Sequence, residues 1–272
     1  MSNELKEIIA GQVEWAERHG VPLDRSNRCP SADENLFMPL SPGSVEEFGE
    51  GAGNELGTPD APGSMASVRS SSALAVNAFD AWRGTDLGAL SRLLTVDPMA
   101  DRLRFEVQYP TGLGGIPPHL DVILDRSGGA PLAIESKFTE VYSPAHNDFR
   151  PSYFEAPGLW DGFDRTERLA VAIAGGSTQF KHLGAAQLIK HALGLKYAYG
   201  PKGFRLLYLW YDWPGEISEA HKGEIGRFVE TVGGDFDFAA LTYQELFEGL
   251  KEIPEPRPGY LSYLEDRYFS DE

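Results

Sequence analysis

Two apolar segments joined by a short polar link decide the fold: HLDVILD at residues 119–125 and PLAIESKFTEV at residues 131–141. Their content of Leu, Ile, Val and Ala is typical of β-strands. The link between them, RSGGA at residues 126–130, is typical of a turn. The pattern therefore predicts a β-hairpin.

The register of this hairpin decides which side chains meet. If the turn is centred on Gly128, Asp121 lies seven residues before the centre and Glu135 seven residues after it. Residues opposite each other in an antiparallel pair share one face of the sheet, with their Cβ atoms roughly 4.5–5.5 Å apart. Because side chains alternate along a strand, Lys137 lies on the same face, and the apolar neighbours of all three point the other way.

Two opposed carboxylates destabilise a sheet, and their burial without partners costs several kcal/mol. A divalent cation between Asp121 and Glu135 would remove both problems, and hard oxygen ligands suit Mg²⁺ or Mn²⁺. The alternative is an ordinary surface salt bridge between Lys137 and one of the acids, which contributes little to stability. The spacing alone leaves both interpretations open.

The segments around the hairpin alternate between helical and extended patterns. Their central order is helix, strand, strand, strand, helix, strand, which predicts an α/β fold whose mixed central sheet is flanked by helices. We expect a single domain over residues 1–272, with an N-terminal helical extension (1–43), a core (44–213) and a C-terminal helix and strap (214–272). Helices are predicted at 3–19, 44–56, 70–94, 178–193 and 216–231, and further strands at 102–109 and 204–213.

The order of the charged residues within this pattern resembles the PD-(D/E)XK nuclease superfamily, the restriction-endonuclease-like proteins. The resemblance covers residues 44–213 and implies an αβββαβ core. It identifies Asp121 as the metal-binding aspartate, Glu135 as the acid of the E-x-K element and Lys137 as its lysine, which positions or activates the attacking water. The carbonyl of Ser136 would be a further metal ligand. One departure is that Pro118 does not immediately precede Asp121.

The superfamily often adds an acidic ligand from its first core helix, sometimes in a G-x-x-x-E pattern, and Glu55 fits that pattern here. The alternative is a solvated acid at a glycine-rich helix end. Glu106, on the first strand, is a weaker candidate for this ligand and is more simply interpreted as an ordinary charged residue of a strand. The helix after the E-x-K strand often presents a glutamine to the substrate, which indicates Gln187, with Lys190 and His191 in the next turn. The alternative there is a hydrated helix face.

Arginines alternate with aromatic residues in the long segment 142–168. Such a combination can contact backbone phosphates and stack on bases, which makes Arg150 and Arg165 candidates for substrate binding. The alternative is a small satellite core beneath a loop.

Composition limits the class of protein. The net charge is −17, which disfavours a general nucleic-acid binder held by a basic surface. No run approaches the roughly 18 apolar residues of a membrane span, and the first residues lack the apolar core of a secretory signal. The single cysteine, Cys29, excludes an internal disulfide framework and a Cys-rich zinc site. We therefore expect a cytoplasmic protein without a membrane partner.

The predicted function is hydrolysis of phosphodiester bonds by a Mg²⁺- or Mn²⁺-dependent nuclease, with DNA favoured over RNA as the partner and a homodimer possible. The main alternative is a binding protein on the same scaffold with a catalytically idle site, which the acidic charge favours. A glycosidase, which also uses paired carboxylates, is a weaker alternative because it has no need of the neighbouring lysine.

Overall fold

The computed structural model describes residues 1–51, 53–58, 61–96 and 99–270. At its centre lies a five-stranded sheet. Its strands, in spatial order, are β3 (Arg102–Gln108), β4 (His119–Asp125), β5 (Leu132–Lys137), β6 (Arg205–Trp210) and β7 (Asp237–Thr242). The pairs β3–β4 and β4–β5 are antiparallel, whereas β5, β6 and β7 are parallel neighbours, so the sheet is mixed.

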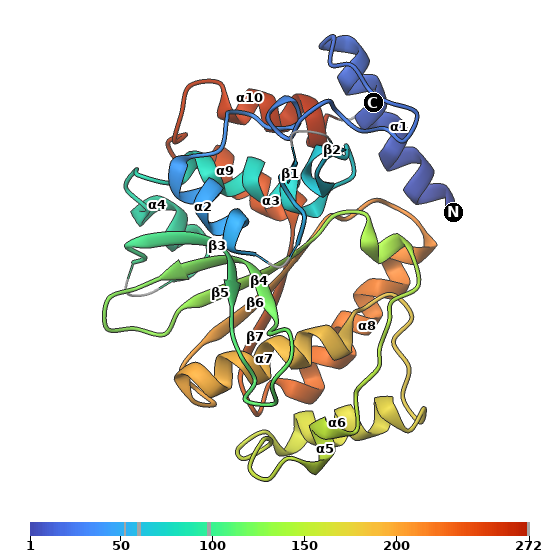
Figure 1. The fold of residues 1–272 in the computed structure, drawn as a ribbon, viewed down its shortest axis with the longest axis vertical. Helices are drawn as coiled ribbons and strands as arrows, with labels where there is room; N and C mark the ends of the chain where they lie inside the picture. The colour runs from blue at the N-terminus through green and yellow to red at the C-terminus, as the bar shows by residue number, and fades with distance from the viewer. Residues whose placement is uncertain (52, 59–60, 97–98, 271–272) are drawn as a thin grey trace.

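Helices cover both faces of this sheet (Figure 1). The helices are α1 (Asn3–Arg18), α2 (Pro42–Glu50), α3 (Ser71–Phe79), α4 (Gly88–Leu93), α5 (Ser152–Glu155), α6 (Asp164–Ala174), α7 (Ala185–Tyr199), α8 (Glu216–Val232), α9 (Tyr243–Lys251) and α10 (Tyr260–Leu264). Ser136 of β5 contacts the first residue of α9, whereas its neighbour Glu135 contacts α7. Since neighbouring side chains of a strand point to opposite faces, α9 and α7 cover opposite faces.

The predicted order of the core elements is confirmed, because α3 is followed by β3, β4, β5, α7 and β6, with short helices between them. The hairpin register is confirmed as well. Ile123 pairs with Ala133 and Leu124 with Leu132, which is the register of a turn centred on Gly128. The polar face of the hairpin is therefore the predicted one.

The helix predicted over residues 178–193 lies further along the chain, as α7. Its start is displaced because the backbone N–H groups of residues 181–183 donate to the carboxylate of Glu224 on α8, at 2.7–2.9 Å, and this holds them in a loop. Gly194, the predicted end, lies inside the helix instead. A Cβ atom at this position would lie 2.3 Å from the carbonyl oxygen of Tyr109, so glycine permits the helix to pack closely on the chain beyond β3.

Two other predicted helices are shorter than expected. The helix predicted at 44–56 is α2, which ends at Glu50, so that Glu55 lies on the following loop. The helix predicted at 70–94 is divided into α3 and α4. Gly84 adopts a positive φ of 74° between them, and this left-handed conformation interrupts the helix.

Strand β7 and helix α9 were not predicted. Phe238 is the single buried residue of β7, which lies at the edge of the sheet, so the strand lacks the apolar pattern of its neighbours. Its presence extends the central sheet into the segment 214–272, beyond the predicted core. No helix of the described residues is long and apolar enough to cross a membrane.

Candidate active site

A row of polar side chains crosses one face of the sheet. The β3–β4 register leaves Glu106 opposite Asp121, and the β4–β5 register continues to Glu135, which is paired with Tyr208 of β6. Residues opposite each other share a face, so carboxylates from three neighbouring strands lie side by side. The row joins Asp121 and Glu135, as the sequence predicted, but it also includes Glu106.

Asp121 is fixed by a hydrogen bond to the backbone of β5, at a position where the regular backbone pairing of β4 with β5 has ended. Regular pairing between β4 and β5 stops at Val122 and Ile134. Beyond this pair, the backbone N–H of Ser136 donates to Oδ2 of Asp121 at 2.7 Å. The hydroxyl of Ser136 points to the opposite face, where it lies 2.7 Å from the hydroxyl of Tyr243. The carboxylate of Asp121 is therefore held beside the backbone of the predicted ligand Ser136.

Glu135 is held from two sides. Its side chain is 2% exposed, and Nζ of Lys137 lies 2.6 Å from its Oε1. Nε2 of the equally buried His191, on α7, lies 3.1 Å from its Oε2. The second contact is close but not aligned as a hydrogen bond, so Oε2 retains accepting capacity with no aligned donor among the described residues. His191 was expected on the substrate side of the helix. It points into the protein instead and positions Glu135.

The pKa values of the neighbouring carboxyl groups in this row are shifted in opposite directions. Burial opposes ionisation of Glu135, but Lys137 and His191 outweigh it and lower the pKa of Glu135 to about 2. Burial also opposes the charge on Lys137, yet the charges of Glu135 and Asp121 outweigh it and raise the pKa of Lys137. Both groups are therefore ionised at neutral pH, as a buried ion pair.

For the other two carboxyl groups of the row, burial and the neighbouring carboxylates outweigh the charge of Lys137. Burial and the charge of Glu135 raise the pKa of Asp121 well above its ordinary value. Burial, with the charges of Glu55 and Glu135, raises the pKa of Glu106 to about 7. The row thus holds more negative charge than Lys137 can neutralise, and a bound cation would relieve that excess.

The residues fit a hard divalent cation in their chemistry. All the acids of the row offer oxygen ligands, and Oε2 of Glu135 is a buried acceptor without an aligned donor. The described part of the chain contains no group of three or more His, Cys, Asp or Glu side chains placed so that together they could hold a metal ion. Mg²⁺ does not require such a cage, because it is commonly held by one or two carboxylates together with waters and substrate phosphates.

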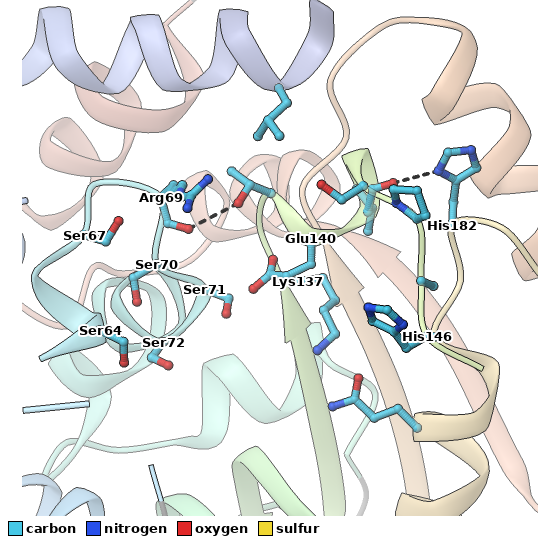
Figure 2. A pocket seen from close by; sticks show the side chains of 18 of the residues that line it. Ser64, Ser67, Arg69, Ser70, Ser71, Ser72, Lys137, Glu140, His146 and His182 are labelled. Carbon is cyan, nitrogen blue, oxygen red and sulfur yellow. Dashed lines mark hydrogen bonds between the residues drawn. The ribbon is translucent and has the colours of Figure 1, made fainter. Parts of the chain in front are cut away.

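A cavity of about 720 Å³ opens beside this row, and Lys137, Glu55 and Gln187 all line it. Figure 2 shows this cavity, with Lys137 between Ser71 and His146. Gln187 lies on the exposed side of α7, one turn before the buried His191. Glu55 lies on the loop after α2, where its Oε2 accepts a hydrogen bond of 2.5 Å from the hydroxyl of Ser64. Both predicted residues therefore lie next to the lysine, although Glu55 does not come from a helix.

The two predicted arginines lie elsewhere. Arg150 is exposed and lies against Gly115 in the loop between β3 and β4. Arg165, on α6, lines a separate cavity of about 580 Å³ together with Arg168 and Arg227. The structure does not bring Arg165 to the carboxylate row.

Sequence reasoning underestimated Glu106 and overlooked His119. Glu106 has a positive φ of 51°, and its Oε2 lies 3.4 Å from Nδ1 of His119. The polar positions of β3 alternate with apolar ones, which indicated a polar face. The long connection over residues 109–118 left the register of β3 against β4 open, so the partner of Glu106 had no sequence signal.

We expect the metal-free protein to lose stability as the pH rises from about 4.5 to 7, and Glu106→Gln to remove part of that loss. A carboxyl with a raised pKa binds its proton more tightly in the folded state, so its contribution is complete below its ordinary pKa of 4.5 and is lost as the pH approaches 7. The shift corresponds to at most about 3 kcal/mol.

Denaturant unfolding in EDTA between about pH 5 and pH 8 measures this difference. Glu46→Gln, a change at an exposed position of α2, is the matched control. An identical pH dependence in wild type and Glu106→Gln would contradict the electrostatic description of the row.

Residues 32–269 match the model of a protein family described as Restriction Endonuclease associating with ARP. The match includes the whole central sheet and every residue of the carboxylate row. No match was found among curated proteins or among solved structures.

Proposed function

Because this chain belongs to the family described as Restriction Endonuclease associating with ARP, a restriction-endonuclease-like nuclease family, we propose that it is a divalent-metal-dependent nuclease that hydrolyses phosphodiester bonds in DNA. The single observation that supports the chemistry is the alignment of Glu106, Asp121 and Glu135 across three strands, with Lys137 beside them. A buried excess of negative charge is unfavourable unless a cation is bound there.

In this proposal Asp121 and Glu135 hold Mg²⁺ or Mn²⁺, and the carbonyl of Ser136 is a further candidate ligand. The bound ion would act as a Lewis acid on the phosphate and lower the pKa of a water molecule. Glu106 replaces Glu55 as the better candidate for a third acidic ligand, because it lies in the row itself. Glu55 contributes through its charge, which acts on Glu106.

Lys137 has two contacts that suit a catalytic role. Its ammonium group is held by Glu135, and its side chain also lines the cavity beside the row. It can therefore donate a hydrogen bond to an attacking water or to the phosphate oxygens as their negative charge increases. Donors already in place for a developing charge need no rearrangement during the reaction.

Cleavage assays on duplex DNA, single-stranded DNA and RNA test the proposal. We expect cleavage with Mg²⁺ or Mn²⁺ that is abolished by EDTA and by Glu135→Gln. Asp237→Asn, at an exposed position of β7, is the control and should retain full activity. Activity that survives EDTA or Glu135→Gln would contradict the proposed site.

The net charge of −17 adds a second expectation for the same experiment. DNA should bind poorly in EDTA and better with divalent ions, and its affinity should fall as the salt concentration rises. Binding without cleavage of any substrate would support the alternative function, a nuclease-fold binding protein with an idle site.

A further inference from the structure

A second cavity, of about 580 Å³, lies between α6 and α8, and arginines dominate its lining. Arg165 and Arg168 belong to α6, and Arg227 belongs to α8. A single acid, Glu230, lines it with them among the described residues. The whole chain has a net charge of −17, so three guanidinium groups around one cavity reverse the sign of the charge locally. We refer to it as the arginine cavity.

Packing holds these side chains in place. A Cβ atom at position 234 would lie 2.9 Å from Nε of Arg165, so Gly234 leaves the space that this side chain occupies. The guanidinium of Arg227 lies over the ring of Phe180, with its Cζ 5.2 Å from the ring centroid. Arg168 follows Arg165 by three residues, and such residues are neighbours on the surface of a helix. The three cations therefore converge on one place.

The arginines have donors available for a ligand. Arg165 and Arg168 take part in no ion pair among the described residues. Arg227 donates to the carbonyl of Gln179 at 3.4 Å and lies 3.8 Å from Oε1 of Glu224, which already accepts a backbone N–H at 2.7 Å. A guanidinium carries five N–H donors in a planar fork that matches the oxygens of a phosphate. The cavity is therefore suited to a phosphate-bearing anion.

One segment of the chain contributes to both cavities. Thr178 and Phe180 line the arginine cavity. His182 and Gly184 line the cavity beside Lys137. This segment connects α6 to α7 (Figure 1). Two residues of extended chain span at most about 7 Å, so residues 180 and 182 place the two cavities next to each other. An extended polyanion that enters one of them can continue into the other.

We infer that the arginine cavity binds backbone phosphates of the DNA substrate at a distance from the bond that is cut. The inference rests on the proposed function, because the shared segment relates this cavity to Lys137 and the carboxylate row. DNA is favoured over an acidic protein as the occupant, since a strand held at the row carries further phosphates at a regular spacing. Such contacts fix the position of the DNA without reading its sequence. They also offset the repulsion between DNA and an acidic chain.

Anisotropy of a fluorescent DNA duplex, titrated with the full chain at several salt concentrations, tests the inference. Ca²⁺ replaces Mg²⁺ in the binding buffer, because it is a hard cation with the same preference for oxygen ligands. Arg165→Ala and Arg168→Ala should each weaken binding about tenfold, the loss of one charge-assisted hydrogen bond. Each should also lower the salt slope by about 0.9, the value for one phosphate of a duplex. Arg168→Lys should keep the salt slope and lose part of the affinity, because it retains the charge without the fork.

A matched control separates local contacts from net charge. The double variant Arg25→Ala/Arg257→Ala removes two exposed arginines outside the cavity and changes the net charge by as much as Arg165→Ala/Arg168→Ala. It should bind DNA almost like wild type, with the salt slope unchanged. Thermal unfolding of both double variants checks that the fold is retained.

The outcomes distinguish this inference from the proposed function. If no substrate is cut but Arg165→Ala/Arg168→Ala loses affinity and salt slope relative to the control, the phosphate site stands and the nuclease proposal fails. If DNA is cut while this variant shows the affinity, salt slope and KM of the control, the phosphate site is wrong and the nuclease stands. A polyglutamate peptide that binds through these arginines more tightly than DNA would assign the cavity to an acidic protein and overturn the inference.

Discussion

Replacing Lys137 with alanine is expected to lower the rate of DNA cleavage by about 10²–10³-fold, because one well-placed group that stabilises developing charge contributes about that much. The ammonium group lies 2.6 Å from Oε1 of Glu135, and the side chain of Lys137 also lines the cavity beside the carboxylate row. The loss should therefore appear mainly in kcat. Steady-state cleavage of DNA with Mg²⁺ measures it.

The same substitution has a cost in stability that must be kept separate from catalysis. Lys137 is 17% exposed and Glu135 2% exposed, so the pair is not the surface salt bridge that the sequence left open as an alternative. Removing one partner of a buried pair leaves an uncompensated charge, which typically costs about 3–5 kcal/mol. Activity must be compared below the unfolding temperature of the variant, which thermal unfolding establishes.

Two further variants make the Lys137 experiment decisive. Lys137→Arg keeps the charge and should preserve stability better than activity, because its planar group does not reproduce the position of an ammonium. Lys251→Ala removes a lysine from a surface pair with Glu248 and should leave both quantities unchanged. A rate for Lys137→Ala within a few-fold of wild type would exclude Lys137 from the reaction.

The hairpin shows which part of the site can be predicted from sequence. The link between its strands is only five residues long, so a symmetric turn determined the register of the strands. That register places Asp121 opposite Glu135. The pairing of two strands joined by a short turn depends on residues that are close together in the sequence. The residues that lie far apart in the sequence, by contrast, depended on tertiary contacts.

His191 illustrates those contacts. The four-residue spacing of Gln187 and His191 predicted that both share one face of a helix. Gln187 is exposed and His191 buried, because the packing of α7 on the sheet places His191 beside Glu135. The start of α7 itself depends on Glu224, which accepts backbone N–H groups from across the fold. No local pattern in residues 178–193 encodes that displacement.

The cavity beside Lys137 was not predicted, for a related reason. Ser70 was correctly predicted as the beginning of a helix, since serine is a favoured N-cap. The destination of that N-terminus, a cavity shared with Lys137, follows from the packing of α3 beneath β4 and β5 and not from the cap. Sequence thus defines helix ends more readily than it defines what they face.

Asp121→Asn is expected to abolish Mn²⁺ binding and cleavage while it stabilises the metal-free protein. Asparagine keeps an oxygen for the backbone N–H of Ser136 but removes the charge that faces Glu135. A carboxyl with a raised pKa contributes stability at low pH that is lost as the pH rises. The advantage of Asp121→Asn in EDTA should therefore grow as the pH rises above the ordinary pKa of the carboxyl, 3.8.

Glu135→Gln is the matched comparison, because it should also abolish metal binding but should change stability in the opposite direction. The pKa of Glu135 is lowered to about 2, so its ionised form contributes stability that is present above its ordinary pKa of 4.5 and is lost as the pH falls toward 2. Near pH 8 the glutamine leaves Lys137 without its partner, which costs about 3–5 kcal/mol. Calorimetry with Mn²⁺ and denaturant unfolding in EDTA measure both effects. Wild-type Mn²⁺ affinity in either variant would remove the proposed metal site, and a change of stability in the same direction in both would show that the two carboxylates are not held in opposite electrostatic states.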